Sequence, residues 1–408
     1  MSYEKNTSVM AEKLIYNIFR FLWIIVLLPK EGQFVVFAAV IIWWTISNRQ
    51  FIKINRVTIW FLTYAGFHLI SIIIAVIARD YALNRIAASL NTCGMWVIAV
   101  WIAGIVSQAE NIDIDRIGKY CVINISIMFV LMEATWFMRS ISLNMILETR
   151  SAWVWDLLSS GETTRFAGML EYPTLVGVFT LLQFPWAFRY LSHTKHKWLS
   201  FGLIPVAFLP VFMTYARMGS FLMLIMIFAA VNYFMLDNGV RLKTLIMIYI
   251  AMAVLVIAVV LINIDSVATM AEAIFNARPG SNSDRMRIYT DTVNKISETS
   301  WIIGAGIKEM NAAGVYPLGS HCTYLGILYK AGILGGISAA IGFATAIIMI
   351  IRKSLKSKDC FALLIVCLTA LLMLFFAVED IDGADWLIVL AFTEVSLYLC
   401  PKFGRINI

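Results

Sequence analysis

The chain has 408 residues, of which 61% are hydrophobic and 14% are charged, and its formal net charge is +7. A soluble domain carries about 25% charged residues, and no compact soluble fold has enough interior for so much apolar surface. Disorder is excluded too, because it needs low hydrophobicity. The composition therefore predicts a polytopic membrane protein. Its basic residues are expected on cytoplasmic loops, where they hold orientation, and not on a nucleic-acid surface.

About twelve apolar segments approach the length of about 20 residues that a membrane-spanning helix needs. Because backbone groups in lipid must be hydrogen-bonded internally, and no alternating barrel pattern is present, these segments are predicted to be helices. The predicted fold is all-α, a single integral membrane domain over residues 1–408 with about 12 transmembrane helices. The segments are 14–28, 34–46, 57–78, 86–106, 117–138, 174–191, 198–214, 219–236, 244–262, 323–350, 360–378 and 384–400.

The placement of Lys and Arg sets the predicted orientation, because loops rich in these residues stay in the cytoplasm. With a cytoplasmic N-terminus, the basic loops near 49–56, 189–197, 241–243 and 352–358 all fall inside. We therefore expect both termini in the cytoplasm.

Two long loops, 139–173 and 263–322, then fall on the outer side. Loops of this length are usually functional in a compact protein. The second loop contains two amphipathic stretches, 265–277 and 284–296, in which apolar residues recur at helical spacing. Such helices are expected to lie on the membrane surface or to fold over a cavity.

Arginines on the predicted outer side are the informative charges, because the orientation rule works against them. Their planar guanidinium binds phosphate with two parallel hydrogen bonds and stays charged. They are Arg85, Arg139, Arg150, Arg165, Arg217, Arg278, Arg285 and Arg287.

Arg217 lies in a short outer turn beside the N-terminus of the next helix, where the helix dipole favours an anion and disfavours a cation. Two interpretations are open: an arginine that holds phosphate, or an anchor that reaches the lipid headgroups. We favour the first. Arg165, Arg285 and Arg287 could each be a solvated or lipid-facing charge, but together with Arg217 they indicate an anion site on the outer face.

His321 is the only histidine on the predicted outer side, and it stands where the long loop enters a span. At a helix N-terminus its neutral form is favoured, and a neutral imidazole can accept a proton. Lys330, inside that span, needs a partner or a cavity. The acidic turn 379–385 could supply a base or pair with the arginines, but ordinary outer-side acidity is the favoured interpretation. No cluster has the spacing of a zinc site, so we predict neither metal nor cofactor.

Several short motifs follow one another within residues 160–345. They are Thr164-Arg165-Phe166, Tyr215-Ala216-Arg217-Met218-Gly219, Arg285-Met286-Arg287-Ile288-Tyr289, Gly304-Ala305-Gly306, His321-Cys322-Thr323-Tyr324-Leu325 and Gly332-Ile333-Leu334-Gly335. Their order and spacing resemble the bacterial O-antigen ligase/polymerase family, which includes Wzy-type polysaccharide polymerases. Family members often carry Asn or Ser at the position of Cys322, and Ser at the position of Ala216.

The resemblance implies a glycosyltransferase of the GT-C type in the bacterial inner membrane, with an active site that faces the periplasm or the exterior. Its donor would be an oligosaccharide on undecaprenyl pyrophosphate, and its reaction would need no metal. The loop 263–322 would lie over the active site.

The resemblance also implies roles for single residues. Arg217 and one arginine of the 285–289 motif would hold the pyrophosphate, and His321 would act on the acceptor hydroxyl, so that Arg217 and His321 are the expected catalytic residues. The expected substrate-binding residues are Arg165, Arg285, Arg287, Tyr215 and Tyr324.

Within this family we favour a polymerase, which joins lipid-linked repeat units into capsule, exopolysaccharide or O-antigen. A ligase that transfers the glycan to a lipid core is the alternative, and a chain-length regulator protein is considered as a partner. A transporter of lipid-linked glycans is the main rival from another class, but paired broken helices are not evident. A metal-dependent GT-C enzyme would want acidic residues in the first outer loop, where 29–33 has one carboxylate.

Overall fold

Every apolar segment predicted from the sequence is helical in the computed structural model. The model describes residues 2–48, 54–136, 154–157, 164–262, 269, 279–311, 314 and 316–400. The long helices are α1 (Ser2–Ile25), α2 (Lys30–Asn48), α3 (Thr58–Ala78), α4 (Leu83–Val106), α5 (Ile114–Thr135), α6 (Thr174–Ser192), α7 (Leu199–Phe212), α8 (Arg217–Asp237), α9 (Leu242–Ile262), α11 (Pro279–Thr299), α12 (Thr323–Lys356), α13 (Phe361–Val378) and α14 (Asp385–Leu399).

Six of these helices are long and apolar enough to cross a membrane, namely α3, α4, α5, α8, α12 and α13. Others that the sequence predicted as spans are helical too, but α7, for example, is shorter. The polytopic membrane class is therefore confirmed, and the larger number of spans stays a prediction.

The loop predicted at 139–173 contains a short β-hairpin, which the all-α prediction did not include. Strands β1 (Trp155–Leu157) and β2 (Thr164–Phe166) pair in antiparallel fashion, with Trp155 opposite Phe166. Both of these rings are buried, and their centroids lie 5.3 Å apart. The amide of Phe166 donates to the carbonyl of Met213 at 2.9 Å, which fixes the hairpin to the turn between α7 and α8. Arg139, Arg150, Arg278 and most of the stretch 265–277 lie outside the described residues.

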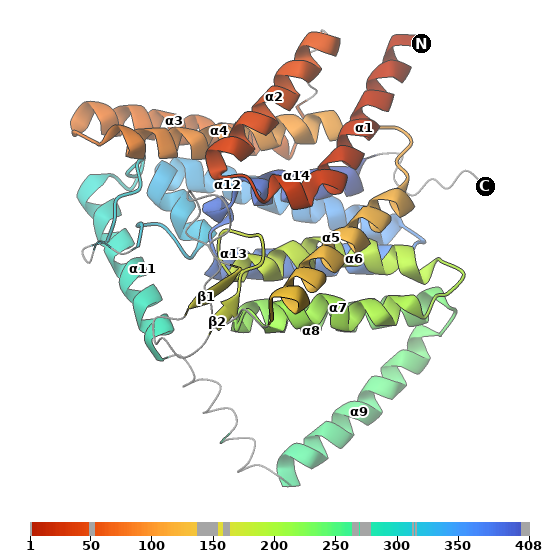
Figure 1. The fold of residues 1–408 in the computed structure, drawn as a ribbon. Helices are drawn as coiled ribbons and strands as arrows, with labels where there is room; N and C mark the ends of the chain where they lie inside the picture. The colour runs from red at the N-terminus through yellow and green to blue at the C-terminus, as the bar shows by residue number, and fades with distance from the viewer. Residues whose placement is uncertain are drawn as a thin grey trace.

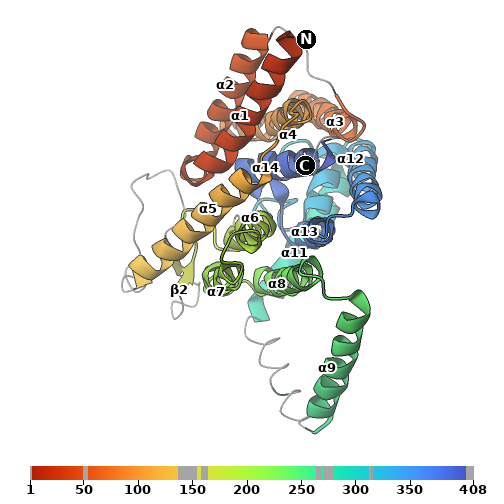
Figure 2. The same ribbon diagram turned by 90° about the vertical axis from the view of Figure 1, so that its right-hand side faces the viewer.

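The helices form a bundle in which α6, α7, α8 and α13 lie below α3, α4, α12 and α14 in the view of Figure 1. Helices α1 and α2 rise from this bundle as a divergent pair, and α9 stands apart from it (Figures 1 and 2). Glycines let α12 approach α3 closely: a Cβ at Gly342 would meet the ring of Phe61, and one at Gly335 would lie 3.3 Å from Tyr64.

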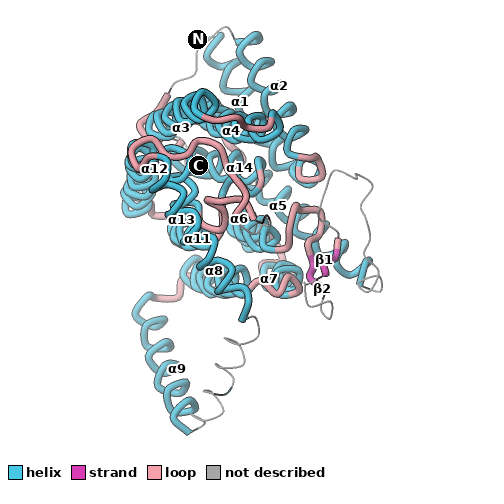
Figure 3. The backbone as a smooth tube through the Cα atoms, turned by 90° about the vertical axis from the view of Figure 1, so that its left-hand side faces the viewer, coloured by secondary structure: helices cyan, strands magenta, loops and turns pink. Residues whose placement is uncertain are grey.

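The connections predicted on the outer side gather at one end of the bundle, which we call the loop end. It comprises 26–29, 79–82, 213–216, 300–311, 314, 316–322 and 379–384. The connections 193–198, 238–241 and 357–360 lie at the opposite end, where Lys197 donates to Asn238 at 2.8 Å. Helix α11 runs across the loop end (Figure 1), and Figure 3 looks onto it. The predicted amphipathic helix 284–296 is therefore confirmed as part of α11, which starts at Pro279.

Helix α12 is interrupted at Gly332, whose φ of 60° and ψ of −164° are not helical. The connection after α11 supplies hydrogen bonds across this break. The amide of Ala305 donates to Tyr329 at 2.7 Å, and the amide of Ile333 donates to Trp301 at 2.8 Å. Backbone groups freed inside a spanning helix must find such partners. Hydrogen bonds across the break therefore hold residues 301–305 against α12. They fix the position of this part of the loop end.

We predict that Gly332→Ala destabilises the folded protein. The left-handed φ alone costs a residue with a Cβ about 1–3 kcal/mol, and that Cβ would overlap the carbonyl of Ile302. Thermal unfolding in detergent, followed by size-exclusion chromatography, measures the effect. Gly66→Ala is the control, because no atom lies within 4 Å of its Cβ and Ala favours a helix. Equal unfolding temperatures for the two variants would contradict this account of the break.

Candidate functional site

The acidic turn between α13 and α14 is the centre of the loop end. Its four carboxylates belong to Glu379, Asp380, Asp382 and Asp385, and all four residues are buried. The favoured interpretation from the sequence, ordinary outer-side acidity, is therefore wrong. An ionised carboxylate is costly to bury unless cations or hydrogen-bond donors face it. Each of these side chains has such a partner from a distant part of the chain.

Two lysines neutralise the middle of the turn. Lys308 forms an ion pair with Asp380 at 2.5 Å, and Lys330, inside α12, forms one with Asp382. The other oxygen of Asp382 accepts the indole N–H of Trp96 at 2.9 Å. Burial opposes ionisation of Asp380, but the charges of Lys308 and Lys330 hold the pKa of its carboxyl below its usual value. The expectation that Lys330 needs a partner is confirmed.

The first carboxylate of the turn joins two residues that the sequence predicted for the site. Arg285 on α11 donates through Nη2 to Oε1 of Glu379 at 2.8 Å. His321 places Nδ1 3.7 Å from Oε2 of the same carboxylate. The hydroxyl of Tyr289, one turn after Arg285, donates to the carbonyl of His321 at 2.7 Å. Arg285 of α11 and His321, two positions before α12, thus both contact the buried side chain of Glu379.

The turn between α7 and α8 forms a second group at the loop end. Arg165 of β2 donates through Nε to the carbonyl of Thr214 at 2.8 Å, so it lies against this turn. Arg217 is the first residue of α8 and is half-buried. The hairpin therefore places Arg165 against the turn that leads into Arg217.

The acidic-turn group and the α7–α8 turn group each contain a residue with a strained backbone. Among the described residues, Tyr215 with a φ of 50° and His321 with a φ of 60° are the non-glycine residues in the left-handed region. That conformation is uncommon for any residue with a Cβ and is an outlier for a bulky one. Such strain tends to collect at functional sites, where surrounding contacts hold it. Both residues belong to the motifs that the sequence selected.

Two other predicted residues point elsewhere. Arg287 is 53% exposed and pairs with Asp284 of its own helix at 3.2 Å. The hydroxyl of Tyr324 donates to the carbonyl of Met373 on α13 at 2.9 Å. Of the two arginines in the 285–289 motif, Arg285 therefore faces the acidic turn and Arg287 faces away from it.

Neither the burial of the acidic turn nor the role of Lys308 was predicted from the sequence. One signal was available: a lysine embedded in an apolar span at Lys330 requires an acid nearby, and 379–385 is the acidic turn next along the chain. The partner of Lys308 could not be predicted, because no periodicity relates residue 308 to residue 380.

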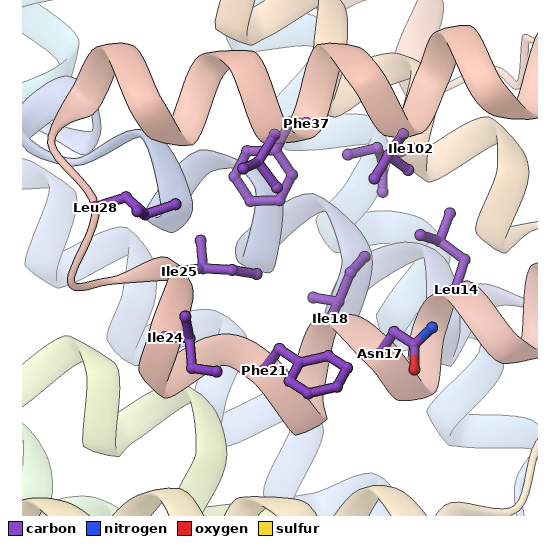
Figure 4. Close-up of a pocket in the computed structure, with 11 residues that line it drawn as sticks. Leu14, Asn17, Ile18, Phe21, Ile24, Ile25, Leu28, Phe37 and Ile102 are labelled. Atoms are coloured by element: carbon purple, nitrogen blue, oxygen red, sulfur yellow. The ribbon is translucent and has the colours of Figure 1, made fainter.

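A separate cavity of about 260 Å³ lies between α1 and α2 and is backed by Ile102 of α4. Figure 4 shows Phe21, Ile25 and Phe37 directed into it, and Asn17 is the one polar residue of its lining. Such a wall suits a lipid chain and offers a sugar almost nothing to hydrogen-bond. In the part of the chain that the structure describes, no cluster of His, Cys, Asp and Glu is arranged to hold a metal ion.

Residues 188–340 match the family model described as O-antigen ligase. The matched stretch runs from the end of α6 into α12 and contains Arg217, Arg285, Arg287 and His321. Curated proteins give no match to the chain. The resemblance to the O-antigen ligase/polymerase family is confirmed over this stretch. The acidic turn lies beyond the matched residues.

We predict that Lys330→Met destabilises the protein by about 3–5 kcal/mol, because it leaves the buried Asp382 carboxylate without its cation. The double variant Lys330→Met/Asp382→Asn should recover at least half of this loss, since the amide can still accept from Trp96. Denaturation of the purified protein measures both. The exposed pair gives the control: Asp284→Asn should cost less than about 1 kcal/mol. A double variant less stable than Lys330→Met would contradict the pairing.

Proposed function

We propose that the chain is a membrane glycosyltransferase that polymerises undecaprenyl-pyrophosphate-linked repeat units into a surface polysaccharide at the outer leaflet. The observation that carries the proposal is the meeting of Arg285 and His321 on the buried Glu379. A cation for pyrophosphate and a proton acceptor for a hydroxyl are the two groups that such a transfer needs. The O-antigen ligase model over 188–340 supports the same reaction class.

The donor pyrophosphate would lie between the arginines of the loop end. Arg285 from α11 and Arg217 from the α7–α8 turn would each offer a guanidinium, and Arg165 would add a further cationic contact. The helix dipole at the start of α8 favours an anion at the same place. Guanidinium forks stabilise the charge that develops on a departing pyrophosphate.

The chemical step would be an inverting displacement at the anomeric carbon of the donor sugar. The acceptor hydroxyl gives its proton to the imidazole of His321 as its oxygen forms the new glycosidic bond. The bond between the anomeric carbon and the pyrophosphate oxygen breaks, and the polyprenyl pyrophosphate leaves with the electron pair. Tyr215 would contact the sugars, and α11 with residues 300–311 and 316–322 would exclude water, which would otherwise hydrolyse the donor.

The proposed orientation places the loop end in the periplasm or exterior of a bacterial inner membrane, with both termini in the cytoplasm. It follows from the basic connections of the opposite end, which include Lys195, Lys197, Arg241 and Lys358. Further proposed partners are membrane lipid and a chain-length regulator protein. One observation favours the alternative of a transporter, because α12 is a broken helix. That break, however, is hydrogen-bonded to residues 301–305.

Deletion of the gene in its own host separates the candidate activities. We expect single repeat units on the surface glycan and loss of the long-chain ladder on a gel, because polymerisation would stop. Long chains that remain on the polyprenyl carrier would instead indicate a ligase. An unchanged ladder in a host without a second copy would exclude both enzymes and restore the transporter.

Two arginines of one helix give a matched pair of variants for the site. Arg285→Ala should lower polymer formation about 100- to 1,000-fold, since it removes a guanidinium that stabilises the leaving group. Arg287→Ala should change it less than about threefold, because the Arg287 side chain is exposed and pairs within its own helix. Complementation of the deletion strain with each variant, at matched membrane levels, measures the ladder. A larger loss for Arg287→Ala would contradict the assignment.

A further inference from the structure

Glu379 is held more firmly than an ordinary residue at the end of a helix. Its side chain is only 3% exposed. Its carbonyl accepts two hydrogen bonds from Thr323, one from the amide at 3.1 Å and one from Oγ1 at 2.8 Å. Thr323 is the first residue of α12 and lies two positions after His321. The start of α12 therefore fixes the backbone of Glu379, and with it the position of the carboxylate beside His321.

The two oxygens of this carboxylate face different residues. Oε1 accepts from Arg285, and Oε2 lies 3.7 Å from Nδ1 of His321. Nδ1 is buried and has no hydrogen-bond partner among the described residues. The distance of 3.7 Å is too long for a hydrogen bond. Catalytic hydrogen bonds are often long without substrate and shorten in the reactive complex.

The imidazole has limited freedom to turn away from Glu379. The left-handed backbone of His321 is held by the hydroxyl of Tyr289, which donates to its carbonyl. The ring of Tyr316 packs edge-on at 5.7 Å between centroids. Glu379 is thus the carboxylate beside Nδ1, Arg285 is bound to its other oxygen, and the two tyrosines are the further ionisable groups that contact His321.

We propose that Glu379 is a positioning residue that acts through His321. It holds Nδ1–H, so that the lone pair of Nε2 faces the acceptor hydroxyl. When the hydroxyl proton moves to Nε2, the carboxylate stabilises the imidazolium and stays ionised, as in other carboxylate–histidine pairs. Pyrophosphate binding competes for Arg285 and frees the carboxylate to close on Nδ1. This inference rests on the proposed function and adds to it a carboxylate outside the residues matched to the family.

A double-mutant cycle on the purified full-length protein tests this role, with polyprenyl-pyrophosphate-linked oligosaccharide as the probe and initial rates from mass spectrometry. Glu379→Gln should lower kcat at least about tenfold without raising the KM for the donor, because Arg285 is then free for pyrophosphate. His321→Ala should lower kcat more. The double variant should be no slower than His321→Ala, because a residue that acts through His321 has no effect without it.

Asp380→Asn provides the matched control on the same turn. The partner of Asp380 is Lys308 and not His321. The fold-loss in kcat that Asp380→Asn causes, whatever its size, should therefore multiply with the fold-loss of His321→Ala. Glu379→Asp keeps the charge and serves as the test if Glu379→Gln does not fold. It should lower kcat less than Glu379→Gln does, and it should lower kcat no further when His321 is already replaced by Ala.

The outcomes separate the two proposals. If Glu379→Gln and His321→Ala multiply, or if Glu379→Gln leaves kcat unchanged while His321→Ala lowers it, the positioning role is wrong and the proposed function stands. If His321→Ala leaves kcat unchanged, the role of His321 in the proposed function is wrong, and the positioning role falls with it.

Discussion

The organisation of this protein depends on four carboxylates buried in one short turn. An ionised carboxylate in a medium of low polarity attracts cations and hydrogen-bond donors strongly, and without them it costs several kcal/mol. The turn 379–385 meets this demand with Lys308, Lys330 and Arg285, which arrive from different segments. Each ion pair therefore also fixes the position of one loop-end segment relative to the others. The charges that hold the fold together are the same ones that assemble the candidate site.

The broken helix α12 complements this ionic centre. Its first part carries Thr323 and Lys330, both of which contact the acidic turn, and its break at Gly332 receives residues 301–305. A continuous helix would remove the hydrogen bonds that Ala305 and Ile333 make across the break. The break and the turn together explain how residues 300–311 and 316–322 are held at the loop end. They also explain why His321 can be held in a strained conformation.

Much of this arrangement could be predicted from composition and periodicity. The positions of the helices, the amphipathic segment within α11 and the grouping of the outer connections follow from apolar length and from the distribution of Lys and Arg. The choice of Arg285 over Arg287 could not be predicted, because it depends on which face of α11 meets α12. The β-hairpin strands were missed because they have three residues each, too few for an alternation of apolar and polar residues to show. The burial of the acidic turn depends on contacts over more than 50 residues, which no local pattern encodes.

The most direct test is whether the chain alone transfers sugars. The purified protein, in nanodiscs and with a chelator present, is supplied only with undecaprenyl-pyrophosphate-linked repeat units, and mass spectrometry follows the products. The account predicts glycans of two and more repeat units, with one undecaprenyl pyrophosphate released for each new linkage. A folded protein that binds the donor and forms no glycosidic bond would contradict it.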